Sequence, residues 1–170
     1  MNSPSLDTWT SLFLIAAFQG IFLFFLILSA KKDQHPGKNY LAALMLSFSV
    51  MLMFYVSFWT GYNIYIRPIE SYFMALPFSL GVLLLLYSKK ISGSEIKQSD
   101  YWHFTPLIAH ILLISILKSF PGGYFEREQL MTIMSSVYAI QVFHMLFYAS
   151  LLFYNLSKTE DKKSDIYKWK

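Results

Sequence analysis

The stretch WTSLFLIAAFQGIFLFFLILSA, residues 9–30, decides the fold class because it runs for 22 residues without a charged side chain. A helix needs about 20 apolar residues to cross a hydrocarbon core of about 30 Å. Inside lipid the backbone has no water to bond, so such a segment forms an α-helix. No Lys or Arg precedes it and it exceeds the apolar run of a secretory signal, so we expect a retained transmembrane helix.

Four further apolar segments of similar length follow the first one. We therefore predict an all-α polytopic bundle of five transmembrane helices over residues 1–156, with a charged cytoplasmic tail at 157–170 that is too short to fold alone. The fourth segment is the shortest and contains two histidines, so a re-entrant or interfacial course stays open for it. The predicted helices cover about 9–30, 40–61, 69–87, 101–117 and 130–156.

The composition agrees with a lipid environment. Hydrophobic residues make up 55% of the chain and charged residues only 14%, against about 25% charged in an average globular protein. This balance excludes an ordinary soluble domain. The absence of cysteine excludes a disulfide framework and a thiolate metal site.

The basic residues predict the orientation of the helices. Cytoplasmic loops of membrane proteins carry an excess of Lys and Arg. With the N-terminus outside and the C-terminus inside, 11 of the 14 basic residues fall in the cytoplasm. Inside are Lys31, Lys32, Lys38, Lys89, Lys90, Lys97, Lys158, Lys162, Lys163, Lys168 and Lys170, and outside are Arg67, Lys118 and Arg127.

The last segment contains polar side chains in an apolar setting, QVFHMLFYASLLFYN at 141–155. On a helix, Gln141, His144, Tyr148 and Asn155 fall within about 60° of one another. A polar group facing lipid is costly, so this stripe is expected to face neighbouring helices. Two interpretations stay open, namely helix-packing contacts and a cleft that binds a ligand or senses a signal. Three small residues nearby favour close helix contact, Ser135, Ser136 and Ala139.

His110 in the fourth segment is predicted to lie at a depth similar to that of His144. We therefore name Gln141, His144, Tyr148 and His110 as the candidate ligand-binding cleft. Two histidines on different helices can also ligate a haem iron, which leaves a redox subunit as an alternative. We predict no metal site and no cofactor. The chain has no GxSxG, HExxH or P-loop motif, so we do not expect an enzyme.

Prolines and glycines predict local features of three helices. Pro77 with Gly81 predicts a kink in the third segment, and Pro106 predicts the start of a helix in the fourth. Gln19 and Gly20 indicate a place where the backbone of the first helix can approach a neighbour closely.

Five stretches together resemble the N-terminal membrane region of bacterial membrane-bound AraC-type transcription regulators. The QG pair at 19–20, the N-x-L-A pattern at 39–42 and the HF-x-P pattern at 103–106 match that family, whereas its G-P-L-x-Y-x-Y pattern is reduced to Gly81 and Tyr87. The resemblance covers nearly the whole chain. The stretches are AAFQGIFLFFLIL, KNYLAALML, LPFSLGVLLLLYSKK, DYWHFTPLIAHILL and QVFHMLFYASLLFYNL.

In that family a multi-helix membrane domain precedes a cytoplasmic helix-turn-helix domain, and DIYKWK at 165–170 resembles the approach to a further transmembrane helix. The resemblance implies the membrane part of a truncated or split regulator. The C-terminal lysines alternate with acidic residues and no recognition helix follows, so we expect no direct contact of these residues with nucleic acid.

We therefore predict an integral sensing or anchoring module of the bacterial inner, cytoplasmic membrane. Its expected partners are the lipid bilayer, a small-molecule ligand, and a second copy of the chain or another membrane protein. A small subunit of a redox or transport complex and a structural membrane protein remain as alternatives.

Overall fold

The structure, a computed structural model, describes residues 5–30, 36–119 and 127–167. These residues form helices joined by short turns and contain no strand, which confirms the predicted all-α class. Four lysines that contributed to the predicted orientation lie outside the described residues, namely Lys31, Lys32, Lys168 and Lys170. The elements are α1 (Thr8–Ser29), α2 (Lys38–Trp59), η2 (Tyr62–Tyr65), α3 (Arg67–Phe73), α4 (Pro77–Ile91), η3 (Gln98–Phe104), α5 (Thr105–Ser119) and α6 (Arg127–Tyr167), where η marks a 3₁₀-helix.

Five segments of the described chain are long and apolar enough to cross a membrane, as the sequence predicts. The third is made of α3 and α4 together, and the fourth of η3 and α5. The chain is thus a multi-pass membrane protein. The five segments are Thr8–Ser29, Lys38–Trp59, Ile69–Ile91, Gln98–Ser119 and Ser135–Asn155.

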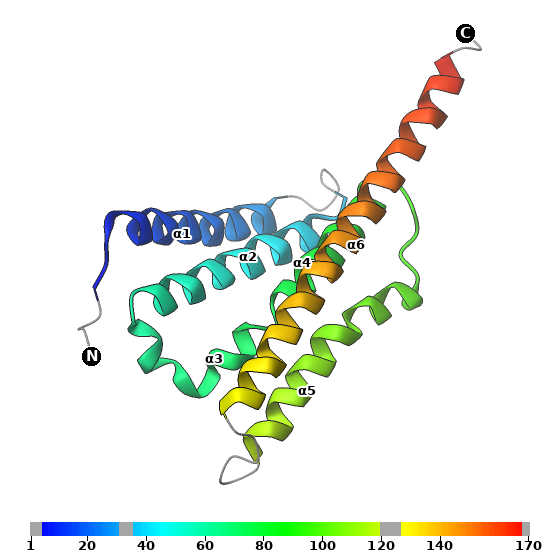
Figure 1. The fold of residues 1–170 in the computed structure, drawn as a ribbon. Helices are drawn as coiled ribbons and strands as arrows, with labels where there is room; N and C mark the ends of the chain where they lie inside the picture. Colours follow the sequence, from blue (N-terminus) through cyan, green and yellow to red (C-terminus); the bar gives the residue numbers. More distant parts are fainter. Residues whose placement is uncertain (1–4, 31–35, 120–126, 168–170) are drawn as a thin grey trace.

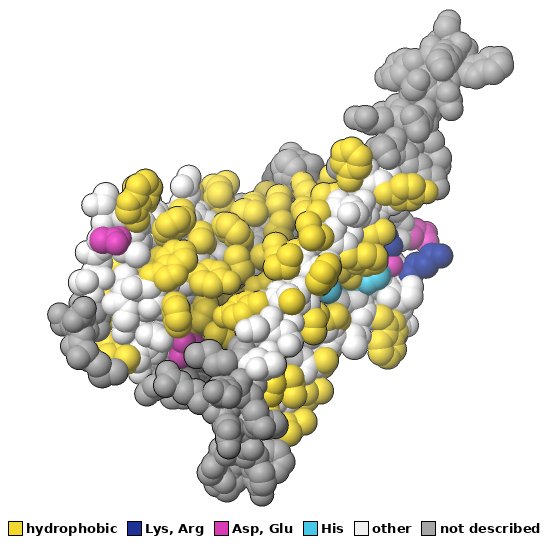
Figure 2. Space-filling view, viewed as in Figure 1, with side chains coloured by type: hydrophobic (Ala, Val, Ile, Leu, Met, Phe, Trp, Pro, Cys, Tyr) yellow, Lys and Arg dark blue, Asp and Glu magenta, His cyan; other side chains and the backbone are white. Residues whose placement is uncertain are grey.

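The surface of the bundle is apolar. Helix α1 buries only Thr10 and Ala17, while the side chains of Phe22 and Phe25 are 63% and 61% exposed. Figure 2 shows hydrophobic side chains over most of one face, with charged side chains toward its ends. In water, apolar patches of this size would be unfavourable. Lipid tails are as apolar as these side chains, so a membrane can cover them without cost.

The helices pack in a row rather than around a common axis. Helix α1 lies against α2, α2 against α4 and α4 against α6, while α5 contacts α3 and α4. Helix α1 therefore occupies one edge of the bundle and α5 and α6 the other, and the C-terminal part of α6 extends beyond the other helices (Figure 1). The core centres on Val82, Leu85 and Leu86 of α4 with Tyr148 of α6.

The first helix contact depends on small residues. A Cβ added to Gly20 would come within 2.0 Å of the Ser49 hydroxyl oxygen. Ala17 and Ala42 are fully buried beside this contact in the same pair of helices. The close approach that was predicted at Gly20 is confirmed, because a side chain there could be accommodated only if the Ser49 side chain of α2 moved.

Lysines gather at one end of the bundle. The Lys38 ammonium group donates hydrogen bonds to the carbonyl groups of Leu28 and Ala30 at the C-terminal end of α1. A Cβ added to Gly37 would lie 3.2 Å from the Cβ of Lys90, which places the start of α2 against the end of α4. Lys89 and Lys90 occupy the last turn of α4.

The opposite end holds the beginning of the described chain. The Ser5 backbone N–H donates to the Thr60 carbonyl oxygen at the end of α2. The Asp7 side chain caps α1 by accepting from the Thr10 backbone N–H at 2.7 Å. This bond, aided by the Thr10 hydroxyl, holds the pKa of the Asp7 carboxyl below its ordinary value.

Both prolines act where the sequence predicts. Helix α3 ends at Phe73, and α4 begins at Pro77 after a short turn. Helix α5 begins at Thr105, directly before Pro106. Helix α6 differs from its predicted end near 156, because the helix continues to Tyr167 through the charged residues that follow the apolar segment.

Candidate functional site

The polar stripe of α6 faces the bundle. Gln141 and Tyr148 are only 5% and 4% exposed, while Phe143 is 72% exposed. The usual pattern of a water-soluble helix is therefore reversed, with polar side chains inside and aromatic ones outside. This agrees with the expectation that the stripe would avoid lipid.

Gln141 contacts the turn that separates α3 from α4. The Phe78 N–H donates to the Ala75 carbonyl at 3.0 Å rather than to Met74, its partner in a regular α-helix. The Gln141 side-chain amide donates a hydrogen bond to the free Met74 carbonyl oxygen. The polar residue in α6 thus satisfies a backbone group that the break before Pro77 releases.

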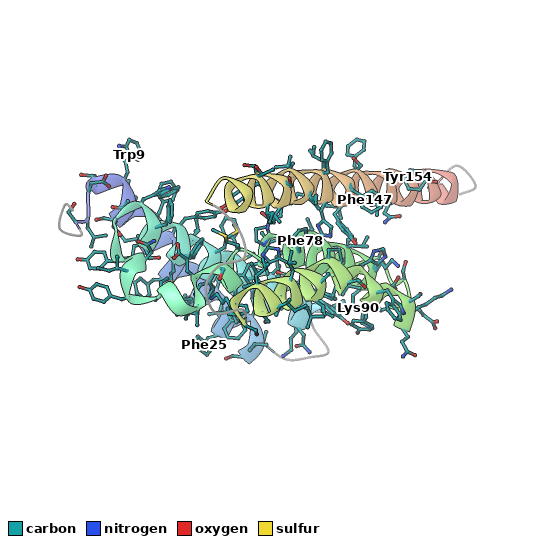
Figure 3. All side chains as sticks on the ribbon, turned by 60° about the horizontal axis from the view of Figure 1, so that its bottom comes forward. Trp9, Phe25, Phe78, Lys90, Phe147 and Tyr154 are labelled. Carbon is teal, nitrogen blue, oxygen red and sulfur yellow. The ribbon has the colours of Figure 1, made fainter. Side chains whose placement is uncertain are left out.

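Two histidines from different helices contact one aromatic ring. The centroid of the Phe78 ring lies 5.8 Å from that of His110 on α5 and 5.2 Å from that of His144 on α6. Figure 3 shows Phe78 inside the bundle, between α6 and the helices next to it. The structure thus brings the two predicted histidines to the same place, around a residue that the sequence analysis did not select.

The nitrogen atoms of these histidines are poorly satisfied. The His110 side chain is 5% exposed. Its ring forms one hydrogen bond, with the backbone of Ser71. Its Nε2 atom and both ring nitrogens of His144 are buried without a hydrogen-bond partner among the described residues. A buried polar group without a partner is destabilising, so these nitrogens are sites where a further hydrogen bond would stabilise the protein.

Tyr148 connects this cluster to a third histidine. Its hydroxyl lies 2.6 Å from the His103 Nδ1 atom of η3, and its ring centroid lies 4.7 Å from that of His144. Gly81 allows this arrangement, because a Cβ at that position would come within 2.8 Å of the Tyr148 Cβ. The sequence analysis did not assign His103 to the cleft. Its position before Pro106, at the start of a helix, was the available signal.

An ion pair fixes the segment that carries His103. The Lys89 ammonium group lies 2.6 Å from a carboxylate oxygen of Asp100, which is buried at the start of η3. The other carboxylate oxygen accepts from the Lys97 backbone N–H at 2.9 Å. Asp100 therefore ties η3 to the end of α4 and helps to place His103 beside Tyr148.

A groove of about 370 Å³ lies between α2, α4 and α6. Its walls include Phe48 of α2, Leu84 of α4 and Met145 of α6, and Gly81 and Tyr148 lie at its inner side. The Tyr148 ring therefore borders the groove as well as the histidine cluster. A molecule in the groove would contact a side chain that also contacts His103 and His144.

Some residues chosen from sequence lie elsewhere. Ser135, Ser136 and Ala139 are exposed rather than packed in a close helix contact, because the side of α6 that carries Gln141 faces α4. Asn155 is half-buried near the end of the membrane segment. Within the described residues no group of three or more His, Asp or Glu side chains is placed to hold a metal ion.

No family model, no curated protein and no solved structure matches this chain.

Proposed function

We propose that this chain is a sensing module of the bacterial cytoplasmic membrane, in which a small molecule binds beside α6 and changes the packing of that helix. The observation that carries the proposal is a set of three buried nitrogen atoms, Nε2 of His110 and both ring nitrogens of His144, which have no hydrogen-bond partner in the described part of the chain. If the two histidines only packed between helices, these nitrogens would stay without a partner. A ligand with polar groups would form hydrogen bonds with them.

The surroundings of the nitrogens indicate the chemistry of the ligand. The rings of Phe78 and Tyr148 contact His144 on two sides, and the adjacent groove is lined mainly by aliphatic and aromatic side chains. We infer a small, largely apolar molecule with one or two hydrogen-bonding groups. In this proposal the molecule enters from the lipid phase, and Tyr148, which lines the groove and contacts His144, connects the groove to the histidines.

Helix α6 provides the route for a signal. It runs without a break from Arg127 to Tyr167 over 41 residues, which corresponds to about 60 Å at 1.5 Å per residue. Helix α6 packs mainly against α4, so most of its contacts with the rest of the bundle lie on one face. A ligand that shifts Tyr148 would change the angle or rotation of the whole rod, including the charged part beyond the membrane segment.

The resemblance to AraC-type membrane regulators supports a link to transcription. The basic end of the bundle, where Gly37 at the start of α2 lies against Lys90 of α4, is also the end from which α6 extends. With the N-terminus outside and the C-terminus inside, this end faces the cytoplasm. In this proposal the module belongs to a truncated or split regulator, and DNA is bound by a helix-turn-helix domain other than these 170 residues.

A chimera tests the proposal. A helix-turn-helix domain joined after Lys170 would control a reporter gene, and one to four alanines would be inserted after Leu156. Each added residue rotates the downstream part of a continuous helix by about 100°, so output should rise and fall with a period of about 3.6 residues. The His144→Ala variant should lose the response to membrane extracts that contain the ligand.

Phe143→Ala is the matched control, because this side chain is 72% exposed on the same helix. It should leave reporter output unchanged. Output that stays constant through all insertions and is the same in His144→Ala and Phe143→Ala would contradict the proposal. A Soret absorption band in the purified protein would instead favour the redox alternative, in which the two histidines ligate haem.

A further inference from the structure

A second groove, of about 310 Å³, lies at the basic end of the bundle between α1, α2 and α4. Its walls come from the last turns of α1, the first turns of α2 and the last turns of α4, including Leu26, Leu41 and Ile91. These positions lie where the membrane segments end. The groove therefore reaches from the depth of the lipid headgroups into the hydrocarbon region.

Lys38 lines this groove in a fixed position. Its ammonium group donates to the carbonyl oxygens of Leu28 and Ala30. A lysine has three N–H donors, so one donor and the full positive charge remain available at the mouth of the groove. The carbonyl groups hold the ammonium group in place and reduce the entropy that binding would otherwise cost.

Lys90 lies beside the groove and carries a second positive charge. Its Cβ and Cγ atoms lie 3.2 and 3.4 Å from the position of a Cβ on Gly37, between two residues that line the groove, Pro36 and Lys38. The side chain is exposed, and unlike Lys89 it has no carboxylate partner among the described residues. None of the described residues that line the groove is acidic.

Tyr87 completes the polar side of the groove. An amphipathic aromatic residue at this depth is typical of the membrane interface, where its hydroxyl can bond a phosphate or an ester group. The groove thus has Lys38 and Tyr87 in its walls and Lys90 beside it, while the other residues that line it are aliphatic. This combination matches a molecule with an anionic head and an apolar chain.

We propose that this groove binds an anionic phospholipid, with its phosphate between Lys38 and Lys90 and one acyl chain along Leu26, Leu41 and Ile91. Basic pockets between transmembrane helices bind acidic headgroups, and each lysine near the membrane surface contributes about a fivefold gain in affinity for anionic lipid. The acyl chain fills the apolar part of the groove. The bound lipid links the ends of α1, α2 and α4.

Native mass spectrometry of the full chain tests this assignment. The protein would be released from mixed micelles that contain equal amounts of phosphatidylglycerol and phosphatidylcholine with identical acyl chains. We expect the wild type to retain phosphatidylglycerol preferentially. Lys90→Gln should reduce that preference about fivefold, and Lys38→Gln should reduce it as well.

Two further variants separate the site from general charge effects. Lys97→Gln removes a charge from an exposed side chain at the same end of the bundle and outside the groove, so the preference should stay at the wild-type value. Leu41→Trp fills the apolar wall and should reduce retention of both lipids. Free glycerol phosphate in excess should not displace the bound lipid, because it lacks the chain.

Equal retention of the two lipids by the wild type would overturn the proposal. So would an equal loss of preference in Lys97→Gln and Lys90→Gln, or unchanged retention in Leu41→Trp. Displacement by glycerol phosphate alone would assign the lysines to a soluble phosphate ligand rather than to a lipid. Lys38→Gln also removes the hydrogen bonds to the carbonyl groups of Leu28 and Ala30, which can weaken the end of α1. The structure gives Lys90 no such bond among the described residues, so Lys90→Gln tests the charge without this effect.

Discussion

Tyr148 is the residue on which the candidate site depends most. It borders the groove between α2, α4 and α6, contacts His144 and bonds His103. Its ring also packs into the hydrophobic core beside Val82 and Leu86. One side chain therefore takes part in both packing and the proposed binding, so its hydroxyl and its ring have to be tested separately.

Tyr148→Phe removes the hydroxyl and keeps the ring. We expect a loss of about 0.6–1.7 kcal/mol in the free energy of unfolding, the range for hydrogen bonds between membrane helices. Unfolding in bicelles followed by steric trapping would measure it. Tyr65→Phe is the control, because Tyr65 is 74% exposed and should tolerate the same change. Equal stability of both variants would show that the bond to His103 contributes nothing.

Gly81→Ala tests the ring of Tyr148. The new methyl group would lie within 2.9 Å of three Tyr148 atoms, including its Cβ, which cannot move without the helix. Overpacking of this kind costs about 1–3 kcal/mol. Gly20→Ala should cost less, because the nearest atom there is the Ser49 hydroxyl oxygen, and a rotation of that side chain relieves the contact.

A double variant completes this experiment. Combined with Tyr148→Ala, the Gly81→Ala change should lose most of its cost, since the clashing ring is absent. Thermal unfolding of the four proteins in the same detergent gives the coupling energy. Additive effects of the two substitutions would place the cause of the Gly81→Ala destabilisation elsewhere in α4.

At the scale of elements, the prolines predicted where helices break or begin, but the sequence did not predict which residues of neighbouring helices face each other. The break before Pro77 and the start of α5 before Pro106 follow from local geometry, because proline lacks an N–H and disfavours the α conformation of the preceding residue. The bond between Gln141 and Met74 joins residues far apart in sequence. The polar stripe predicts that this side of α6 faces the bundle, but it does not predict which turn of which helix lies opposite Gln141.

The end of α6 shows a second limit at this scale. Loss of hydropathy after residue 156 marks the end of the apolar segment, but the helix continues to Tyr167. Lys, Glu and Asp side chains in water are compatible with a helix, and Lys and Glu favour it. The boundary of a membrane segment and the boundary of a helix therefore have different physical causes, which explains the difference between the predicted and observed ends.

Gln141→Leu tests the link between α6 and the break in the third segment. The variant leaves the Met74 carbonyl oxygen buried without its partner, so we expect a loss of about 1–3 kcal/mol in the free energy of unfolding. Gln19→Leu is the matched control, because Gln19 is exposed on α1 and the same substitution places an apolar side chain toward lipid. A similar loss in both variants would show that Gln141 has no special role.

At the scale of the whole molecule, the sequence predicts most of the fold and the polar residues of the candidate site, but not Phe78 or His103, which lie among them. Five segments are long and apolar enough to cross the bilayer, and the lysine-rich loops predict the orientation. The histidine cluster depends on three helices that meet at Phe78, a residue with no polar signal of its own. Aromatic residues are so common here, 19% of the chain, that composition could not single it out.

The orientation of the whole molecule can be tested because the chain has no cysteine. If all five segments cross, the two ends of the described chain lie on opposite sides of the membrane, and the excess of lysine predicts that the C-terminal end is cytoplasmic. In spheroplasts, a membrane-impermeant maleimide should label Ser5→Cys directly and Ser164→Cys only after permeabilisation. Phe143→Cys, within the fifth segment, should stay unlabelled in both conditions because lipid shields it. Labelling of Ser5→Cys and Ser164→Cys from the same side would mean that one of the five segments does not cross, and the fourth, which joins a 3₁₀-helix to a short α-helix, would be the first to re-examine.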